Sequence, residues 1–494
     1  MRWLLALAGG AVITLSLAPF NFWPAALLGP GLLYLLLRDT APRQAAGLGW
    51  LFGLGLFASG TSWVYVSIHD YGHAAPWLAG LLTFAFACAL ALFYSLLGWC
   101  WARWIRQRQP GLLDAGGFAA LWLAQEYLRS WLLTGFPWLY LGYSQLDGPL
   151  AGLAPIGGVW LPGLVVVFSA CVLAQLFSLR QARRRWPLYL AAILPLWLAG
   201  GLLQLHSWTS TKGTPLSFAA VQGNIDQSIK WDAGQVANQL RTYQRLSMTS
   251  APTDLLIWPE NAIPVSQYMA EDFLHDMDRF AKSRHSTLLS GIPLLQYTDD
   301  RPKYYNAIIS VGLHSGSYQK QKLVPFGEYV PLQQSLRGLI EFFDLPMSDF
   351  YRGPAGQPPL TVGDQRIAPY ICYEVVYPEF ARQLATHSDL LLTISNDAWF
   401  GNSIGPLQHL QMAQMRALES GRWMIRATNN GVTALIDQHG KVRQRLPRFA
   451  EGVLSGQIQP MQGQTPYLRL GIWPWLLLAA ALLALSIWHR QRRR

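Results

Sequence analysis

The stretch Ala368-Pro369-Tyr370-Ile371-Cys372-Tyr373-Glu374 joins a short apolar run to a cysteine and an acidic residue. Uninterrupted apolar runs of this length are typical of strands that are covered on both faces of a sheet. The strands predicted in this way are Leu216–Val221, Asp254–Trp258, Thr287–Gly291, Ala307–Val311, Ala368–Cys372, Leu390–Ile394, Met424–Ala427 and Val432–Ile436. Helical patterns lie near 233–249, 269–284, 377–386 and 406–420. Residues 206–469 are therefore expected to form an α/β domain.

The regions on either side of this domain are too apolar for a soluble protein. Of the 494 residues, 51% are hydrophobic and only 13% are charged, whereas a soluble protein is about 25% charged. Uncharged runs of roughly 20 residues can cross a bilayer as helices. The predicted spans lie twice within Trp3–Leu37, then at 45–68, 75–102, 115–133, 160–179, 187–205 and 471–488. The chain is thus expected to have about eight spans, divided into a seven-helix region (1–205), the α/β domain (206–469) and a last helix with a basic tail (470–494).

The placement of the arginines predicts the orientation of these spans. Residues 206–469 carry 23 Lys and Arg against 22 Asp and Glu, whereas the membrane part carries 15 Arg against 5 acidic residues. All of those arginines except Arg129 fall on the side that holds Arg2. Because basic residues of short loops stay in the cytoplasm, both termini are expected there and the α/β domain on the opposite side. The basic excess lies beside the spans, so nucleic acid is not an expected partner.

Polar residues are scarce within the predicted spans. Glu126 and Arg129 stand three residues apart in 115–133, a spacing that places both on one helical face. They are expected to pair at an interfacial end of the helix; the alternative is a functional polar site within the membrane. Without further polar groups along the spans, a transporter is poorly supported.

Cys372 is the only cysteine outside the predicted spans, which contain Cys88, Cys100 and Cys171. A lone cysteine in an oxidising compartment has no internal disulfide partner, so it is either buried filler or a reactive thiol. Its place at the end of a strand is one where reactive groups are commonly displayed. Both interpretations stay open on position alone.

Two other strand ends carry charged residues. A strand ends in Ile257-Trp258-Pro259-Glu260-Asn261, and another carries Lys320 into a Pro/Gly turn that ends at Glu328. Taken singly, each charge has an ordinary explanation as a helix cap, an edge-strand lysine or a loop acid.

Together, Glu260, Lys320 and Cys372 on successive strand ends resemble the nitrilase superfamily. Further motifs resemble its membrane-bound branch, the apolipoprotein N-acyltransferase family: Gln222–Ile225, Lys230–Asp232, Ile371–Glu374, Ser395–Gly401, Gln408-His409 and Thr428–Gly431. The resemblance covers essentially the whole chain. It implies an αββα sandwich between the last two of eight spans, in the inner membrane of a bacterium and on its periplasmic side.

The resemblance implies acyl transfer through a thioester, with neither metal nor cofactor. A thiol needs an adjacent base, which Glu260 could supply if the fold brings it near Cys372. Lys320 and a backbone N–H would stabilise the oxyanion, and Glu328 would hold Lys320 or assist proton movement. The implied donor is the sn-1 ester of a membrane phospholipid, and the acceptor is the α-amine of a diacylglyceryl-cysteine apolipoprotein. A monomer is expected.

Other candidates surround these residues. Trp231, Tyr373, Glu374 and Phe400 match family positions near the site, and they are expected to bind substrate or shape the pocket; the alternatives are aromatic packing and strand capping. The segment 336–351 is more apolar than a solvent loop. Its residues Leu339, Phe342 and Phe343 are expected to form a lid or an acyl-chain contact, unless they belong to a buried helix.

Competing functions remain to be tested. A membrane-tethered amidase would hydrolyse the acyl-enzyme with water, and a non-catalytic scaffold or transporter would need none of the three residues. Gly401–Gly405 fits a G-x-S-x-G elbow around Ser403, but Asp397–Phe400 separate that serine from its strand. His409 lacks the companions of a metal site and is expected to be a polar helix residue.

Overall fold

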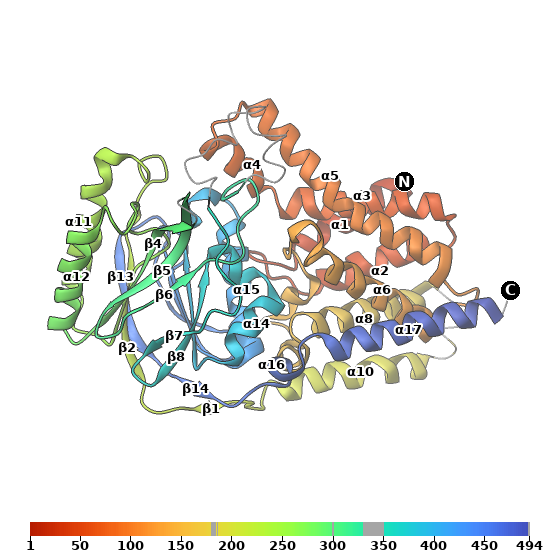
Figure 1. Ribbon diagram of the computed structural model, residues 1–494. Coiled ribbons are helices and arrows are strands. Elements are labelled where there is room, and N and C mark those ends of the chain that lie inside the picture. Colours follow the sequence, from red (N-terminus) through yellow and green to blue (C-terminus); the bar gives the residue numbers. More distant parts are fainter. Residues whose placement is uncertain (179–183, 185, 299–300, 330–349, 493–494) are drawn as a thin grey trace.

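The computed structural model describes residues 1–178, 184, 186–298, 301–329 and 350–492. These residues form a bundle of apolar helices with an α/β domain at one end (Figure 1). Both chain ends lie on the side of the bundle that faces away from the α/β domain. The α/β domain is inserted between the last two long helices, α10 (Trp186–Leu203) and α17 (Trp473–Arg492).

Among the described residues, four helices are long and apolar enough to cross a membrane. They are Pro76–Ile105 (α5 and the turn η2), α8 (Trp160–Ser178), α10 and α17. A fifth candidate is α3 (Pro42–Gly60), which bends by 55° into the segment Trp63–Tyr71 (α4 and η1). The remaining predicted spans correspond to the shorter helices α1 (Arg2–Thr14) and α2 (Ala25–Leu37) and to α6 (Leu112–Arg129), which carries three charges. The structure therefore supports a helical membrane part but only part of the predicted number of spans.

Glycine allows three of these helices to pack closely. A Cβ atom on Gly10 of α1 would lie 1.8 Å from the carbonyl oxygen of Phe52, and one on Gly49 of α3 would lie 2.1 Å from that of Tyr94. The backbones of α1, α3 and α5 consequently approach to a distance that only glycine permits, as is common in membrane bundles.

The expected pairing of Glu126 with Arg129 was wrong. Both side chains are buried in the bundle, not at an interface. Glu126 accepts hydrogen bonds from the indole of Trp122 and the backbone of Leu141, while Arg129 donates to the carbonyls of Phe136 and Trp138. The two charges instead hold the loop that follows α6, because its backbone groups need buried partners.

The α/β domain contains two six-stranded sheets. One has the order β13-β2-β3-β4-β5-β6 and the other β12-β11-β10-β9-β8-β7, with the three central strands of each parallel along β2-β3-β4 and β8-β9-β10. The first sheet comprises β2 (Leu216–Gln222), β3 (Leu255–Ile257), β4 (Thr287–Thr298), β5 (Arg301–Gly312), β6 (Gly316–Gln319) and β13 (Gly452–Ile458). The second comprises β7 (Leu360–Val362), β8 (Gln365–Ile371), β9 (Leu390–Ser395), β10 (Met424–Thr428), β11 (Ala434–Ile436) and β12 (Val442–Arg445). A short ribbon pairs β1 (Ser210–Thr211) with β14 (Met461–Gln462).

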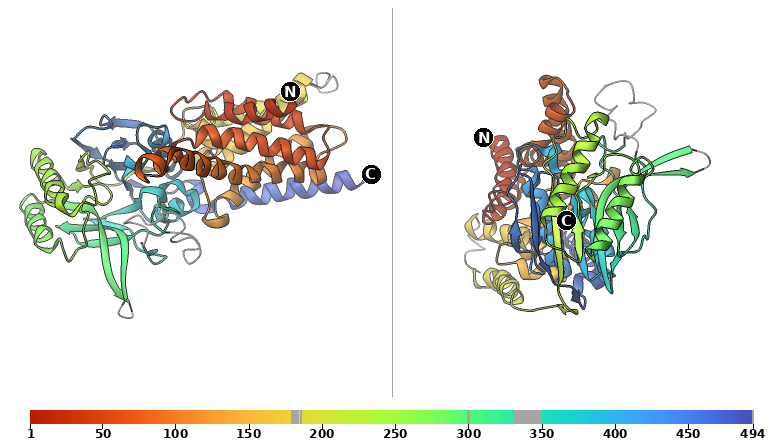
Figure 2. Two further views of the ribbon diagram at one scale, coloured as in Figure 1. Left: turned by 90° about the horizontal axis from the view of Figure 1, so that it is seen from above. Right: turned by 90° about the vertical axis from the view of Figure 1, so that its left-hand side faces the viewer.

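The sheets face each other and helices cover both outer faces, so the domain is an αββα sandwich. Along β2, Phe218 and Ala220 enter the core between the sheets, whereas Ala219 and Val221 pack beneath α11 (Val236–Thr249) and α12 (Glu271–Ser283). Since alternate residues of a strand point to opposite faces, both sets must be apolar. Figure 2 shows the same layers from two sides, with the long β4–β5 hairpin projecting from them.

The second sheet is covered by α14 (Pro378–Thr386) and α15 (Gly405–Ser420), which lie between it and the membrane bundle. The apolar core beneath these helices continues without interruption into the core of the bundle. A buried carboxylate of Glu419 on α15 also accepts a hydrogen bond from the backbone of Val159, ahead of α8. The second sheet and the membrane helices are thus packed against each other through α14 and α15.

Candidate active site

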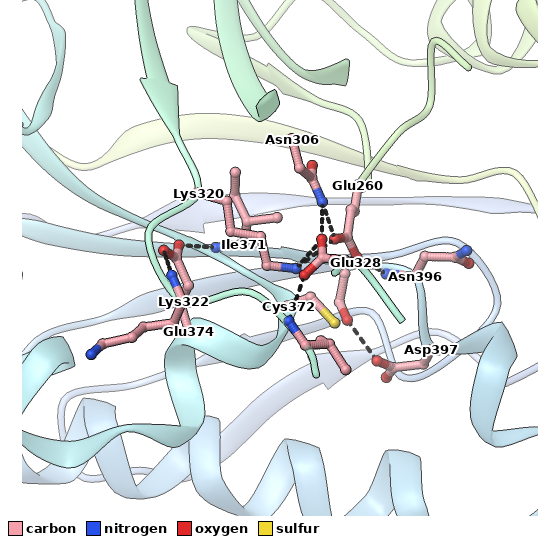
Figure 3. A network of polar contacts seen from close by, with 12 residues as sticks. Glu260, Asn306, Lys320, Lys322, Glu328, Ile371, Cys372, Glu374, Asn396 and Asp397 are labelled. Atoms are coloured by element: carbon pink, nitrogen blue, oxygen red, sulfur yellow. Dashed lines mark hydrogen bonds and ion pairs between the residues drawn. The ribbon is translucent and has the colours of Figure 1, made fainter. Parts of the chain in front are cut away.

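Three charged side chains from the first sheet meet in a buried cluster (Figure 3). Glu260 lies shortly after β3, Lys320 directly follows β6, whose last residue is Gln319, and Glu328 lies in the loop beyond. The Lys320 ammonium is 3.1 Å from Oε1 of Glu260 and 2.8 Å from Oε1 of Glu328. The predicted strand around Lys320 therefore ends one residue earlier, and the lysine lies at the open end of the sheet.

A further polar residue, which sequence reasoning missed, joins the same two acids. Asn306 of β5 donates through Nδ2 to Glu260 Oε1 at 2.8 Å and to Glu328 Oε1 at 2.7 Å. The other oxygen of Glu260 accepts from the backbone N–H of Asn396 at 2.8 Å. Each oxygen of Glu260 consequently has at least one donor, as is usual for a buried charge.

The electrostatics of the cluster keep Glu260 ionised. Burial opposes its charge, but the Lys320 ammonium and the donors of Asn306 and Asn396 hold the pKa of Glu260 below its usual value. Burial likewise opposes the charge of Lys320, yet the carboxylates of Glu260 and Glu328 raise the pKa of that lysine. A carboxylate in this state can accept a proton at neutral pH.

Cys372 follows the last residue of β8 and is part of the first turn beyond the sheet. Its backbone has φ +50°, a conformation that costs roughly 1–3 kcal/mol for a residue with a Cβ and that clusters at functional sites. Figure 3 shows its thiol converging with Glu260, Lys320 and Glu328. Burial and the Glu260 charge raise the pKa of the Cys372 thiol, against the opposing effect of Lys320. The resting group is therefore a thiol that needs a base.

Glu374 connects the lysine segment to the cysteine segment. Its Oε1 accepts from the backbone N–H of Gln321 at 2.6 Å and of Lys322 at 3.2 Å, and its Oε2 accepts from that of Ile371 at 2.9 Å. The Tyr318 hydroxyl donates to the same carboxylate. Burial raises the pKa of Glu374 to about 7. The side chain thus fixes the residues after Lys320 against the residue before Cys372.

The other predicted residues lie around this centre. Trp231 packs against a small apolar cluster of Leu323 and Phe350, and its indole N–H is buried without a hydrogen-bond partner among the described residues. Tyr373 is buried and its hydroxyl donates to the Gly135 carbonyl of the membrane part at 3.4 Å. Phe400 packs edge-on against Trp63, with ring centroids 4.8 Å apart. Leu339, Phe342 and Phe343 lie outside the described residues.

Lys230 is a second buried lysine near the acids. Its Nζ lies 3.4 Å from the backbone carbonyl of Glu260, and burial lowers the pKa of Lys230 to about 8, against the opposing charge of Glu260. The motif Lys230–Asp232 marked this position in the sequence. Its contact with the main chain of Glu260 could not be read from the sequence, because the two residues are joined only by the fold.

A polar network from the second sheet lies behind Cys372. His409 on α15 has Nε2 at 3.1 Å from the Cys372 carbonyl oxygen and Nδ1 at 3.0 Å from Asp397. Asp397 also forms an ion pair with Arg426 at 2.6 Å and accepts from Ser395. His409, Asp397 and the Cys372 thiol could reach a common ion, but Arg426 already balances the charge of Asp397.

The membrane part reaches the site through an arm formed by Trp63–Tyr71. Ser67 donates to the Trp399 carbonyl at 2.8 Å, and the Trp138 indole donates to Gln408 on α15 at 2.7 Å. Ser403 accepts from the backbone of Gly405 at the start of α15, and the turn η9 (Asp397–Phe400) separates it from β9. That arrangement lacks the strand-to-serine step of a nucleophile elbow.

Comparison with known proteins agrees with this architecture. The family model described as "Apolipoprotein N-acyltransferase N-terminal domain" matches residues 9–172, and "Carbon-nitrogen hydrolase" matches residues 217–467. A CN-hydrolase superfamily protein of known structure from Xanthomonas campestris is 18% identical, covering 54% of this chain and 97% of that one at a TM-score of 0.38. The fold and the site define a carbon–nitrogen hydrolase domain carried by a membrane bundle.

Relatives that match the chain over its full length identify one family within this class. The apolipoprotein N-acyltransferase of Azotobacter vinelandii is 58% identical, covering 100% of this chain and 98% of the relative. That of Pseudomonas putida is 55% identical, covering 99% and 98%, and that of Vibrio vulnificus is 42% identical, covering 98% and 96%. The chain belongs to the apolipoprotein N-acyltransferase family.

Proposed function

We propose that this protein transfers an acyl chain from a membrane phospholipid to the N-terminal α-amine of a diacylglyceryl-cysteine apolipoprotein. Cys372 is the nucleophile, Glu260 the general base, and Lys320 the cation that stabilises the oxyanion, supported by Glu328. One observation carries the proposal: an ionised Glu260, a charged Lys320 and the Cys372 thiol converge at the open ends of two facing sheets. No metal or cofactor is needed for this chemistry.

The first half-reaction transfers the acyl chain to the enzyme. Sγ of Cys372 attacks the sn-1 ester carbonyl of the phospholipid as its proton passes to Glu260. The tetrahedral oxyanion is stabilised by Lys320 and by the backbone N–H after Cys372. Collapse breaks the ester C–O bond, and Glu260 returns the proton to the departing alkoxide. A thioester and a lysophospholipid result.

The second half-reaction regenerates the thiol. The neutral α-amine of the acceptor attacks the thioester, and Glu260 takes the proton that the nitrogen loses. Collapse breaks the C–S bond, and the proton passes to the sulfur of Cys372. An amide is formed, and the two substrates occupy the site in turn, which predicts ping-pong kinetics.

The apolar surroundings suit substrates that stay in the membrane. Trp231 packs with Leu323 and Phe350 next to the loop of Lys320 and Glu328, and the arm Trp63–Tyr71 joins the membrane bundle to the residues beside the site. An acyl chain rising from the bilayer would find apolar partners there. The role of Leu339, Phe342 and Phe343 as a lid or an acyl-chain contact stays a prediction from the sequence, because these residues lie outside the described ones.

We also propose the membrane topology. The helices α1, α2, α3, α5, α6, α8, α10 and α17 would serve as eight spans of a bacterial inner membrane, with residues 206–469 on the periplasmic side and both termini in the cytoplasm. The position of the chain ends away from the α/β domain supports this orientation, as does the arginine bias. The protein is proposed to act as a monomer.

The nearest alternative is a membrane-anchored amidase that releases its acyl group to water. Lysophospholipid release should be followed in detergent with and without a diacylglyceryl-cysteine peptide. A transferase gives a single turnover without the peptide and steady release with it. Continuous release of free fatty acid without the peptide would favour the hydrolase, and no release at all would favour a scaffold.

A further inference from the structure

The network behind Cys372 contacts the nucleophile through its main chain. His409, Asp397 and Arg426 are each at least 98% buried, and none of them is used as acid, base or nucleophile in the proposed reaction. Nε2 of His409 must donate to the Cys372 carbonyl, because a carbonyl oxygen can only accept. The imidazole therefore determines the direction in which this carbonyl points.

The direction of the Cys372 carbonyl also sets the direction of the N–H group on the same peptide. The peptide between Cys372 and Tyr373 is planar and trans, so its carbonyl oxygen and the Tyr373 N–H point to opposite sides. Cys372 has φ +50°, a conformation that relaxes readily unless contacts from the surroundings hold it. Holding the carbonyl back toward α15 aims the Tyr373 N–H away from α15.

We propose that His409 is a positioning residue that directs the Tyr373 N–H toward the oxyanion of both tetrahedral intermediates. The inference rests on the proposed thioester mechanism and adds a residue to it. An oxyanion donor acts only when it is fixed before the charge develops, and losing one typically costs about 10²–10³-fold in rate. His409 supplies that fixation without touching the substrate.

The ring of His409 is itself held on three sides. Asp397 lies 3.0 Å and Arg426 3.1 Å from Nδ1. The rings of Trp138 and Phe400 also pack against it, with centroids 5.9 and 6.1 Å away. With Nε2 donating, Nδ1 of the neutral ring accepts a charge-assisted hydrogen bond from the guanidinium of Arg426, which Asp397 holds in turn, so rotation of the imidazole would break that bond.

The neighbouring residue ties the same turn of α15 to the membrane part. Gln408 accepts from the Trp138 indole and donates to the carbonyl of Gly60, at the end of α3. The orientation of His409 is consequently set from both the sandwich and the bundle. This explains why the bundle packs directly against the N-terminal turn of α15.

The test separates oxyanion formation from the reactivity of the sulfur. Alkylation of Cys372 by iodoacetamide is a displacement without an oxyanion, whereas acylation by a phospholipid needs one. Both rates should be measured in detergent on the full-length protein, for the wild type and for two variants. His409→Phe removes the donor. His409→Gln keeps an amide donor for the same carbonyl. Thermal unfolding checks that each variant is folded.

We expect His409→Phe to acylate about 10²-fold more slowly while its alkylation rate changes less than about twofold, and His409→Gln to recover part of the acylation rate. Equal loss of both rates, or no loss of either, would overturn the role of His409. A wild type that forms no acyl-enzyme would instead count against the proposed function itself.

Discussion

The ammonium nitrogen of Lys320 lies 3.1 Å from Oε1 of Glu260, with both side chains almost completely buried. Because Glu328 holds the same ammonium at 2.8 Å, Lys320 lies between two carboxylates. Burial and the Glu260 charge raise the pKa of the nearby Cys372 thiol, whereas Lys320 holds the pKa of Glu260 below its usual value. The resting site therefore pairs a thiol with an ionised carboxylate that can take its proton.

Removal of the cation should destabilise the fold as well as abolish activity. Lys320→Met leaves two carboxylates buried together, and breaking a buried pair costs about 3–5 kcal/mol. We expect the double variant Lys320→Met/Glu328→Gln to recover much of the lost stability but none of the activity. Thermal unfolding in detergent measures the first and acylation the second. Lys282→Met, from an exposed pair with Asp278, is the control and should change little.

Asn306 should be needed for the rate although it cannot react. Asn306→Leu removes the donor shared by Glu260 and Glu328, and hydrogen bonds to charged groups contribute about 1.5–3 kcal/mol each. We expect acylation to fall by about 10–100-fold. Single-turnover release of lysophospholipid measures this. Asn238→Leu, on the exposed face of α11, should keep the wild-type rate; equal rates for the two variants would contradict the role of Asn306.

The pH dependence of acylation should lack an acid limb near neutrality. Glu260 must be ionised to act as a base, and its pKa lies below the usual carboxyl value. Glu260 is therefore fully ionised above the usual pKa range of a carboxyl group. The ionised fraction falls only at pH values below that range. We expect the acylation rate to be constant from about pH 5 to pH 7. Because burial raises the pKa of Glu374 to about 7, the profile should also be measured for Glu374→Gln. A half-maximal rate near neutral pH that persists in this variant would contradict an ionised Glu260.

Glu374 should act through geometry rather than charge transfer. Glu374→Gln replaces one acceptor oxygen by an amide that cannot accept from the backbone N–H groups it faces. Leaving buried donors unpaired costs about 1–3 kcal/mol each. Without these hydrogen bonds, the segment after Lys320 and the segment before Cys372 should no longer be held at a fixed distance from each other. We expect lower thermal stability and a loss of activity of at least tenfold. Glu271→Gln, at an exposed position on α12, should match the wild type in both assays.

Much of the fold could be predicted from the sequence because its strands are continuous apolar runs. The predicted strands from Leu216–Val221 to Val432–Ile436 all correspond to strands of the structure, with ends shifted by up to three residues except in β4 and β5, which extend seven and six residues further into their hairpin. Parallel strands end at one edge of a sheet, so residues at strand ends could be expected to meet there. The two facing sheets then bring Glu260, Lys320 and Cys372 together.

The rest depended on contacts between distant segments. Asn306 lies inside a strand and has no local signal, and the contact of His409 with the Cys372 carbonyl joins residues 37 positions apart. The 55° bend after α3 and the partners of Arg129 are likewise set by packing between the bundle and the domain. Helical spacing placed Glu126 and Arg129 on one face but could not show that both would contact the loop after α6.

The most direct test of the account is the intact mass of the purified protein after incubation with phospholipid alone. The wild type and Ser403→Ala should gain the mass of one acyl chain and lose it when a diacylglyceryl-cysteine peptide is added, whereas Cys372→Ala should gain nothing. An acyl adduct that persists in Cys372→Ala, or a wild type with neither adduct nor lysophospholipid, would contradict transfer through a Cys372 thioester.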